Sequence, residues 1–496
     1  MVGSLAPSPC RNSKIEKHII FAVFFLCMSK NEDTETVNLQ KPSGTRDFTP
    51  GDVQPQIWLQ NRIRQFFEQY GFEEVMLPTY DFFTLYEIRS GEKIINDIFT
   101  FYDPPKHREE EDPVLYALRP ELTAPICRFF ITSELSHYPQ PLKLFYIANC
   151  FRYDEPSPGR YREFWQAGCE LFGVDTVEAD IEIMVMAMRF LESLELPHYT
   201  LRLNDLRILR TLLEENQLDE PSQNQIFGFI DKHSSSLRKI EIGAIDDQTE
   251  EEVIQEFRRD IGTLGLPESL AETLEFFLSL VGTATEVYKE LKTILAPYPS
   301  ALDSLKQSDL QEISHRFDLL GYTKYVIDIG IARGLDYYTS TVFEIDVPSL
   351  GKQKQICGGG RYNHLMEDFG GAETPATGFA YGFDRILLAL EKENLLPSPR
   401  PKADLFIAVK NGLEAEGMLL AENLRKEGFR VETDLKSRSF KRCSKFVNAV
   451  KIPYVIFLGP REVESKRYTL KNFETREQET DLAYDDLVKQ LRAKIE

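Results

Sequence analysis

The stretch of sequence that decides the fold is Phe151–Gln166, which reads FRYDEPSPGRYREFWQ. It places three arginines within eleven residues, around the turn-forming segment Pro156–Gly159, and an apolar run leads into it. A hairpin of this kind can direct guanidinium groups at a polyphosphate while an aromatic ring covers a base. Taken alone, three such arginines more often belong to a solvent-exposed Arg/Glu hairpin, so the interpretation depends on the rest of the chain.

Two unusual downstream segments favour the first interpretation. They are Ala332–Tyr338 (ARGLDYY) and Cys357–Tyr362 (CGGGRY). Together with Phe151–Gln166 they resemble the histidyl-tRNA synthetase family of class II aminoacyl-tRNA synthetases, and the resemblance runs from about Lys41 to the C-terminus.

The resemblance implies both a fold and a reaction. The implied fold is α+β: an antiparallel class II synthetase catalytic sheet with helices, a helical insertion, and a C-terminal α/β anticodon-binding domain. The implied reaction is that of a histidine–tRNA ligase, which activates L-histidine with ATP, accompanied by Mg²⁺, to histidyl-adenylate. The acyl group then passes to the 3′ end of tRNA(His), and the products released are AMP and pyrophosphate.

Composition limits the alternatives without deciding between them. A chain of 496 residues is long enough for two or three domains with separate cores. A net charge of −21 argues by itself against a nucleic-acid-binding protein. The field at a local site depends on nearby side chains, however, and residues 436–451 contain six Lys or Arg and no Asp or Glu.

The cysteines and the N-terminus indicate the compartment. Seven scattered cysteines without a C-x-x-C pair fit a reducing cytosol, so we expect a cytoplasmic protein without disulfides or structural zinc. The apolar run 19–27 looks like part of a signal peptide, but no small-x-small site follows and the run is too short to span a bilayer. We therefore favour residues 1–27 as an upstream or dispensable leader over a targeting peptide, and expect no membrane partner.

Hydrophobic periodicity gives the organisation along the chain. Apolar residues at helical spacing predict a helix over 55–70, followed by a strand over 73–78. This order resembles motif 1 of class II synthetases, which forms their dimer interface, so the resemblance implies a homodimer. Further strands are expected at Val114–Leu118, Leu142–Phe151, Glu163–Leu171, Tyr199–Asn204, Tyr325–Ile331, Thr341–Val347 and Thr377–Tyr381.

These patterns predict five regions. They are a disordered or dispensable extension (1–40), a first catalytic part (41–204), a helical insertion (205–323), a second catalytic part (324–398) and an anticodon-binding domain (403–496). In the last region, strands at 404–409, 430–434 and 454–459 alternate with helices at 414–427 and 440–450, which favours a mostly parallel sheet.

The segment Arg119–Pro125 carries a carboxylate and a hydroxyl two residues apart at a strand–helix junction. Both groups can hydrogen-bond one ammonium group, although a helix cap by Glu121 or Thr123 explains the pattern equally well. After the hairpin, Gln166 and Glu170 lie four residues apart and project from one face of a strand. Gln166 then suits the amino or carboxylate end of the substrate, and Glu170 its imidazole.

Resemblance to the family assigns the remaining site residues. Arg333 and Arg152 are the expected catalytic residues, through contacts with the α-phosphate, and Asn363-His364 replace the commoner Asp-Gly. The expected histidine-binding residues are Glu121, Thr123, Arg152, Gln166, Glu170, Arg333, Tyr337, Tyr338 and Tyr362. The expected ATP-binding residues are Arg152, Asp154, Arg160, Phe164 and Arg385. The expected tRNA-binding residues are Lys436, Arg438, Lys441, Arg442 and Lys445.

Several departures and alternatives stay open. Asp154 stands where the class II pattern usually has Glu, and Glu155 is adjacent, so either carboxylate could take the usual role. Tyr337 and Tyr338 could also be packing residues. A catalytically inactive regulatory subunit of ATP phosphoribosyltransferase is the main alternative function, but such regulators lack the C-terminal domain and the intact histidine-specific segments. The synthetase-like regulatory domain of a stress kinase is a third alternative, but the sequence contains no kinase motif.

Overall fold

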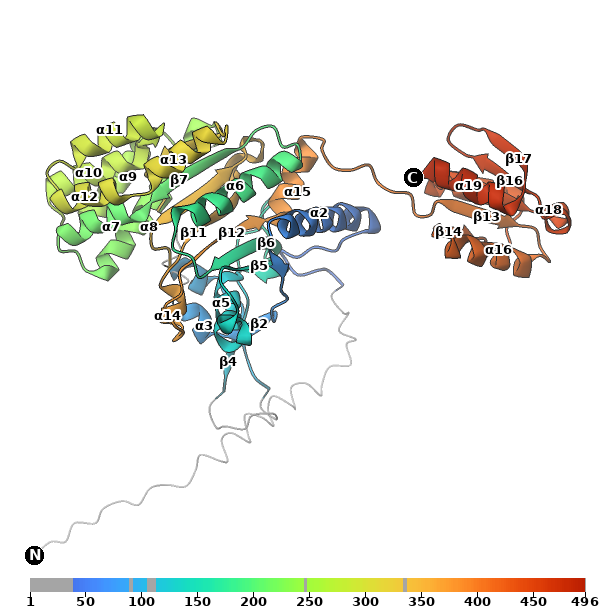
Figure 1. The fold of residues 1–496 in the computed structure, drawn as a ribbon, viewed down its shortest axis with the longest axis horizontal. Helices are drawn as coiled ribbons and strands as arrows, with labels where there is room; N and C mark the ends of the chain where they lie inside the picture. Colours follow the sequence, from blue (N-terminus) through green and yellow to red (C-terminus); the bar gives the residue numbers. More distant parts are fainter. Residues whose placement is uncertain (1–38, 89–91, 105–112, 245–247, 333–336, 496) are drawn as a thin grey trace, which may run out of the picture. The chain divides into compact units, whose positions relative to one another are not determined.

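The computed structural model describes residues 39–88, 92–104, 113–244, 248–332 and 337–495 (Figure 1). The chain divides into two compact units, 1–47 and 48–496. The described part of the first contains a turn in which the Thr45 amide donates to the Pro42 carbonyl at 3.2 Å. No helix among the described residues is long and apolar enough to cross a membrane.

The larger part of the second unit is built around a nine-stranded sheet with the order β1-β5-β6-β12-β11-β10-β7-β9-β8. Its strands are β1 (Glu73–Glu74), β5 (Leu142–Phe151), β6 (Glu163–Phe172), β7 (Thr200–Asp205), β8 (Val281–Gly282), β9 (Tyr325–Asp328), β10 (Thr341–Asp346), β11 (Gln355–Arg361) and β12 (Ala376–Gly382). All neighbours pair antiparallel except β1–β5 and β7–β9. The predicted α+β class is confirmed.

Helices and a small second sheet surround this sheet. The helices are α2 (Pro50–Gln69), α3 (Thr84–Glu87), α4 (Glu92–Asn96), α5 (Thr123–Thr132), α6 (Val177–Ser193), α14 (Leu365–Asp368) and α15 (Phe383–Lys392), with the 3₁₀ helices η2 (Glu134–His137) and η3 (Pro348–Gln353). The small sheet has the order β2-β4-β3, from β2 (Tyr80–Phe82), β3 (Thr100–Tyr102) and β4 (Leu115–Leu118).

Helix α2 shows how local sequence sets an element. It begins earlier than predicted because Thr49 and Asp52 form a capping box and Pro50 occupies the first turn. Its apolar stripe of Leu59, Ile63 and Phe67 is fully buried. The strand predicted after it is shorter than expected, since only Glu73–Glu74 pairs with the sheet.

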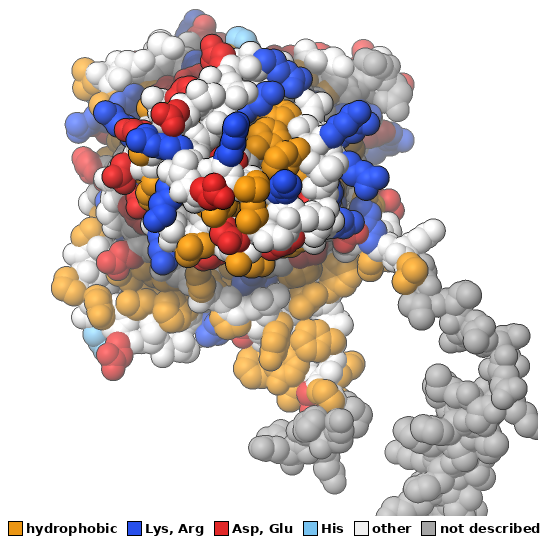
Figure 2. Space-filling view, turned by 90° about the vertical axis from the view of Figure 1, so that its right-hand side faces the viewer, with side chains coloured by type: hydrophobic (Ala, Val, Ile, Leu, Met, Phe, Trp, Pro, Cys, Tyr) orange, Lys and Arg blue, Asp and Glu red, His pale blue; other side chains and the backbone are white. Residues whose placement is uncertain are grey.

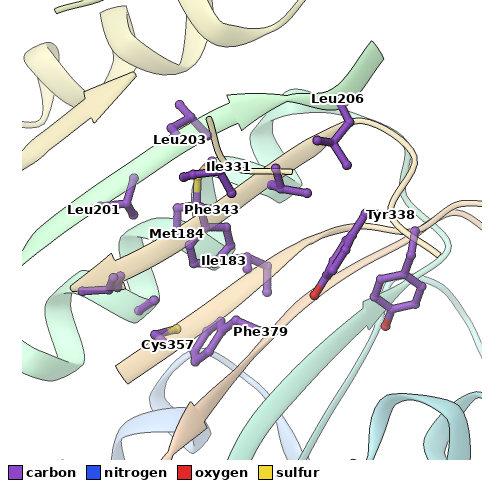
Figure 3. Packing of buried hydrophobic residues seen from close by; sticks show 14 of the residues in the cluster. Ile183, Met184, Leu201, Leu203, Leu206, Ile331, Tyr338, Phe343, Cys357 and Phe379 are labelled. Carbon is purple, nitrogen blue, oxygen red and sulfur yellow. The ribbon is translucent and has the colours of Figure 1, made fainter. Parts of the chain in front are cut away.

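Strand β11 was not predicted as a strand, because glycine disfavours strands. Packing across the sheet requires glycine at Gly359 and Gly360 of this strand. An ideal Cβ on Gly359 would lie 2.6 Å from the Phe379 Cβ and 2.8 Å from the Phe343 ring. The two phenylalanines flank β11 on the core side, so only a residue without a side chain fits between them. Figure 3 shows both rings beside Ile183 and Met184 of α6, which cover this face.

Residues 206–319 are almost entirely helical. The helices are α7 (Leu206–Glu215), α8 (Glu220–Glu241), α9 (Glu250–Gly262), α10 (Glu268–Ser279), α11 (Ala284–Ile294), α12 (Pro299–Gln307) and α13 (Leu310–Leu319). Figure 1 draws them as one group beside β7. Arg238 of α8 ties the group to the sheet, because its guanidinium reaches the buried carboxylate of Asp328 on β9 at 3.0 Å.

The C-terminal part has a five-stranded sheet with the order β14-β13-β15-β16-β17. Its elements are β13 (Leu405–Val409), α16 (Glu414–Lys426), β14 (Val431–Thr433), α17 (Phe440–Val450), β15 (Tyr454–Leu458), α18 (Pro460–Ser465), β16 (Tyr468–Asn472), β17 (Gln478–Leu482) and α19 (Tyr484–Ile495). The first three strands in chain order are parallel, as predicted, whereas β16 and β17 add an antiparallel pair. The prediction of a mostly parallel sheet was therefore only half right, because the polar residues of this hairpin give a weak strand pattern.

Figure 2 looks onto the C-terminal part and shows basic and acidic side chains interspersed over its surface, around a hydrophobic patch. Two hydrophobic clusters fill its interior. One lies beneath α16 and α19, and the other lies beneath α17. The helices thus cover both faces of the sheet, which is the arrangement expected when parallel strands are joined by helical crossovers.

Candidate active site

A pocket of about 440 Å³ opens on the face of the large sheet that carries the β5–β6 hairpin. The predicted site residues of the catalytic part that the structure describes all line it: Glu121, Thr123, Arg152, Asp154, Arg160, Phe164, Gln166, Glu170, Tyr337, Tyr338, Tyr362 and Arg385. Arg333 lies outside the described residues. The sequence patterns come from segments up to 264 residues apart (121 to 385), and the sheet brings them together.

The floor of the pocket has almost no side chains. Gly358 on β11 and Ala380 on β12, which pair across the sheet, both line it. Gly378 on β12 lies directly beside Glu170 on β6. An ideal Cβ on Gly378 would collide with the Glu170 carboxylate. Glycine is therefore needed here so that the Glu170 side chain can rest on the sheet.

Glu170 lies at the closed end of this floor and is 1 % exposed. Its carboxyl accepts hydrogen bonds from the Thr123 and Tyr146 hydroxyls, each at 3.2 Å, and from the Tyr362 hydroxyl. Burial raises the pKa of the Glu170 carboxyl to about 8, although the hydroxyls oppose the shift. A carboxyl with this pKa can exchange a proton with an imidazole near neutral pH.

Glu121 and Thr123 lie at the start of α5. The Glu121 carboxylate accepts the amides of Thr123 and Ala124, the latter at 2.9 Å, so it does cap the helix. It nevertheless also lines the pocket, and a carboxylate with two oxygens can accept further donors. Helix capping by Glu121 is thus compatible with the predicted binding of an ammonium group by the same carboxylate.

Three arginines converge at the other end of the pocket. Arg385 donates to the carbonyls of Gly159 at 3.2 Å and Gln355 at 2.6 Å, which fixes its guanidinium. Burial, together with the charges of Arg160 and Arg152, lowers the pKa of Arg385 to about 10. Such mutual repulsion between partly buried cations is relieved by a polyanion.

Arg152 connects the hairpin to the rest of the site. Its Nε donates to the Pro120 carbonyl at 2.8 Å, and its guanidinium lies 5.4 Å from the centre of the Phe164 ring. Both side chains line the pocket, and the ring leaves a surface on which a planar base can stack.

Asp154, rather than Glu155, is the pocket carboxylate of the hairpin. It forms an ion pair with Arg160 at 2.5 Å and its side chain is 12 % exposed, whereas Glu155 points to solvent. Asp154 therefore orients Arg160. The Arg162 Nε donates to the Asp154 backbone carbonyl at 3.3 Å, and its guanidinium lies 3.7 Å from the centre of the Tyr153 ring.

Comparison with known proteins agrees with this arrangement. The sequence model described as "Histidyl-tRNA synthetase" matches residues 44–386. A curated relative from Methanocaldococcus jannaschii, named histidine–tRNA ligase, is 37 % identical over 446 residues, which is 89 % of this chain and 97 % of the relative. The chain belongs to the histidyl-tRNA synthetase family.

Solved structures show the same fold. The histidyl-tRNA synthetase from Nostoc sp. PCC 7120 aligns with a TM-score of 0.72 at 21 % identity, over 92 % of this chain and 100 % of that one. A protein from Bacillus halodurans described as an ATP phosphoribosyltransferase regulatory subunit/histidyl-tRNA synthetase aligns with a TM-score of 0.62 at 22 % identity, over 83 % of this chain and 97 % of that one. The fold alone therefore does not separate the two functions.

Sequence reasoning missed two residues that hold pocket residues in place without lining the pocket themselves. Tyr146 donates to Glu170 from the neighbouring strand and stands directly opposite Gly168. A tyrosine within the apolar run of β5 was the available signal. The other is Arg361, which holds Asp180 at 2.9 Å and the Thr176 carbonyl at 3.1 Å, and so anchors the end of β11 beside Tyr362.

A second family model, "Anticodon binding domain", matches residues 405–494. Within it, Lys436, Lys441, Arg442 and Lys445 are exposed. Arg438 differs from them, because its guanidinium forms an ion pair with Asp434 at 2.5 Å and lies 4.5 Å from the centre of the Phe446 ring. Its charge is thus engaged within the domain.

Proposed function

We infer that this chain is a histidine–tRNA ligase. The observation that carries the inference is the pocket itself, in which a buried carboxyl with three hydroxyl donors and a cluster of arginines lie at opposite ends of one glycine-lined floor. The carboxyl end suits an imidazole, and the arginine end suits a polyphosphate. Family membership and the anticodon-binding domain support the same reading.

The proposal places histidine at the Glu170 end. Glu170 and the Tyr362 hydroxyl read the imidazole, since this group both donates and accepts a hydrogen bond. Glu121 and Thr123 receive the α-ammonium group, while Gln166 takes the ammonium or carboxylate end. Tyr337 and Tyr338 enclose the side chain, with ring centres 4.7 Å apart.

ATP occupies the arginine end in this proposal. Arg152 contacts the α-phosphate, Arg160 and Arg385 the remaining phosphates, and Phe164 stacks on adenine. Mg²⁺ enters with the nucleotide as part of the substrate, held mainly by phosphate oxygens and water. Among the described residues no group of three His, Cys, Asp or Glu side chains is arranged to bind a metal ion, and we assign the ion no protein ligand.

The reaction follows from this placement. A carboxylate oxygen of histidine attacks the α-phosphorus, the bond to the bridging oxygen breaks, and pyrophosphate leaves. The arginines stabilise the charge that develops on the phosphoryl oxygens, which is electrostatic rather than covalent catalysis. Arg333, by resemblance, joins Arg152 at the α-phosphate. A hydroxyl of the 3′-terminal ribose of the tRNA then attacks the acyl carbonyl, and AMP leaves.

ATP–pyrophosphate exchange with each of the twenty amino acids tests the proposal. We expect exchange with histidine alone, because a site that must satisfy buried polar groups rejects analogues that lack the matching donors and acceptors. Exchange with no amino acid would favour the regulatory-subunit alternative.

We further propose a homodimer. The outer face of the small sheet carries four aromatic rings, Tyr80, Phe82, Phe101 and Tyr116, with neighbouring centres 5.4–5.7 Å apart. Tyr80, Phe82 and Phe101 are 39–54 % exposed. Contiguous apolar surface of this kind marks interfaces, and it directly follows the segment that resembles motif 1.

Light scattering tests the dimer. We expect about twice the chain mass of 57.2 kDa. Phe82→Asp should dissociate the dimer, whereas Phe276→Asp, at a 40 % exposed phenylalanine on α10, should not. A monomer at concentrations where the enzyme is active would contradict the proposal.

We also propose a cytoplasmic location for the protein. Five cysteines are free and buried, which fits a reducing compartment: Cys127, Cys150, Cys169, Cys357 and Cys443.

A further inference from the structure

The loop between β14 and α17 in the C-terminal domain holds an unusually exposed leucine. Leu435 is 80 % exposed. A single exposed leucine is ordinary on protein surfaces and needs no explanation by itself. What distinguishes Leu435 is the structure of its loop and the charge around it.

The loop is organised by a buried carboxylate. The Asp434 side chain is 1 % exposed and accepts the amides of Lys436, at 3.3 Å, and Arg438. Its second set of donors comes from side chains, the Arg438 guanidinium at 2.5 Å and the Cys443 thiol at 3.6 Å. Burial raises the pKa of Asp434, but these hydrogen bonds outweigh it and lower the pKa below its usual value.

Further contacts fix the loop against the helix. Arg438 lies over the Phe446 ring of α17, and that ring packs against Phe406 of β13 at 5.6 Å. Ser437 adopts the left-handed conformation with φ of 47°, which a residue other than glycine adopts only when its surroundings require it. The backbone that carries Leu435 is therefore preorganised rather than free to withdraw the side chain.

Exposed cations follow this leucine along the chain, in the loop and on the first turns of α17. Lys436, Lys441, Arg442 and Lys445 are all exposed, and none of the residues from 436 to 451 is acidic. On a chain with a net charge of −21, this combination fits an anionic partner that also offers an apolar face. The unstacked bases of a single-stranded RNA loop have that chemistry, because each base has an apolar face beside a charged backbone.

We propose that Leu435 is a base-contacting residue, held by the Asp434-centred loop against an unstacked base of the substrate tRNA while the exposed cations of the loop and α17 contact phosphates. This inference rests on the proposed function, which supplies the RNA. Because rigid presentation lowers the entropic cost of binding, the contact is worth more than that of a flexible surface leucine.

The test compares Leu435→Ala with a matched control in the full-length chain. Leu419 is 64 % exposed on α16 of the same domain, where the neighbouring charges are mostly acidic. We expect Leu435→Ala to lower kcat/KM for tRNA about 5- to 10-fold, the effect of losing a partly buried leucine contact. Leu419→Ala should leave charging at the wild-type level.

Salt dependence separates an apolar contact from an electrostatic one. Lys441→Ala should flatten the plot of log affinity for tRNA against log salt by about 0.7, because it removes one phosphate contact to a single strand. Leu435→Ala should shift the plot down without changing its slope. A changed slope for Leu435→Ala, or tRNA charging equal to that of Leu419→Ala, would overturn the inference.

The failure of this inference is distinguishable from failure of the proposed function. If the wild-type chain catalyses histidine-dependent ATP–pyrophosphate exchange and charges tRNA, the proposed function stands. An unaffected Leu435→Ala variant then refutes only the role of the loop.

Discussion

The substitution Glu170→Gln keeps the volume of the side chain but replaces the carboxyl with an amide that does not titrate. In the free protein, burial raises the pKa of the Glu170 carboxyl to about 8, whereas the imidazole of free histidine titrates near 6.5. A dry site disfavours an unpaired charge. We therefore expect the bound pair to hold one shared proton, which makes it neutral overall.

The pH dependence follows from counting protons. Below about pH 6.5 both partners are protonated when free, so binding releases a proton and kcat/KM for histidine falls as the pH falls. Between about pH 6.5 and pH 8 the free partners and the bound pair hold the same number of protons, so kcat/KM does not change with pH. Above pH 8 Glu170 has lost its proton, binding must take one up, and kcat/KM falls roughly tenfold per pH unit.

The assay is ATP–pyrophosphate exchange with Glu170→Gln and the wild type from about pH 5.5 to 9.5, since kcat/KM reports the free enzyme and free substrate. The ratio of the two proteins cancels the titrations of the substrate itself. At neutral pH the variant should be about 10- to 100-fold lower, from the loss of a charge-assisted hydrogen bond worth about 1.5–3 kcal/mol. Above pH 8 this difference should shrink.

Two results would refute the reasoning. A wild-type kcat/KM that rises through pH 8 would mean that histidine binds as a neutral imidazole beside an ionised Glu170. An unchanged kcat/KM in the variant at neutral pH would remove Glu170 from imidazole recognition altogether.

Three further predictions concern the same site and its neighbours. Gly378→Ala should abolish histidine-dependent exchange because its Cβ displaces Glu170, whereas Gly262→Ala on α9, where a Cβ meets open space, should leave exchange intact. Arg333→Ala should lower kcat of exchange by about 10² or more if this arginine stabilises charge in the transition state; normal exchange would make it structural. Deleting residues 401–496 should spare exchange and cripple tRNA charging, and a truncated chain that charges tRNA with wild-type kcat/KM would show that this domain does not bind it.

Much of the frame could be predicted from local pattern. Strand β5 has the expected bounds, Leu142–Phe151, and β6 and α17 differ by at most one residue. Strand alternation also placed Gln166 and Glu170 on one face, where both line the pocket. These predictions succeeded because periodicity depends only on neighbours in the sequence.

Non-local packing decided the rest. The glycine run Gly358–Gly360 is part of a central strand, in which phenylalanines from two other strands leave no room for a Cβ on Gly359. The choice of Asp154 over Glu155 depended on where Arg160 lies, and Arg438 proved to be committed to Asp434. None of these outcomes can be predicted from the spacing of residues along the sequence.

The sequence by itself determined the residue types, the order of the strands along the chain and the face on which each side chain stands. Only the tertiary structure decided that Glu170 would be enclosed by hydroxyls from positions 24, 47 and 192 residues away, and that burial would raise its pKa to about 8. The physical reason is that desolvation acts through space. It depends on how many segments exclude water from one atom, and that number exists only once the sheet has formed.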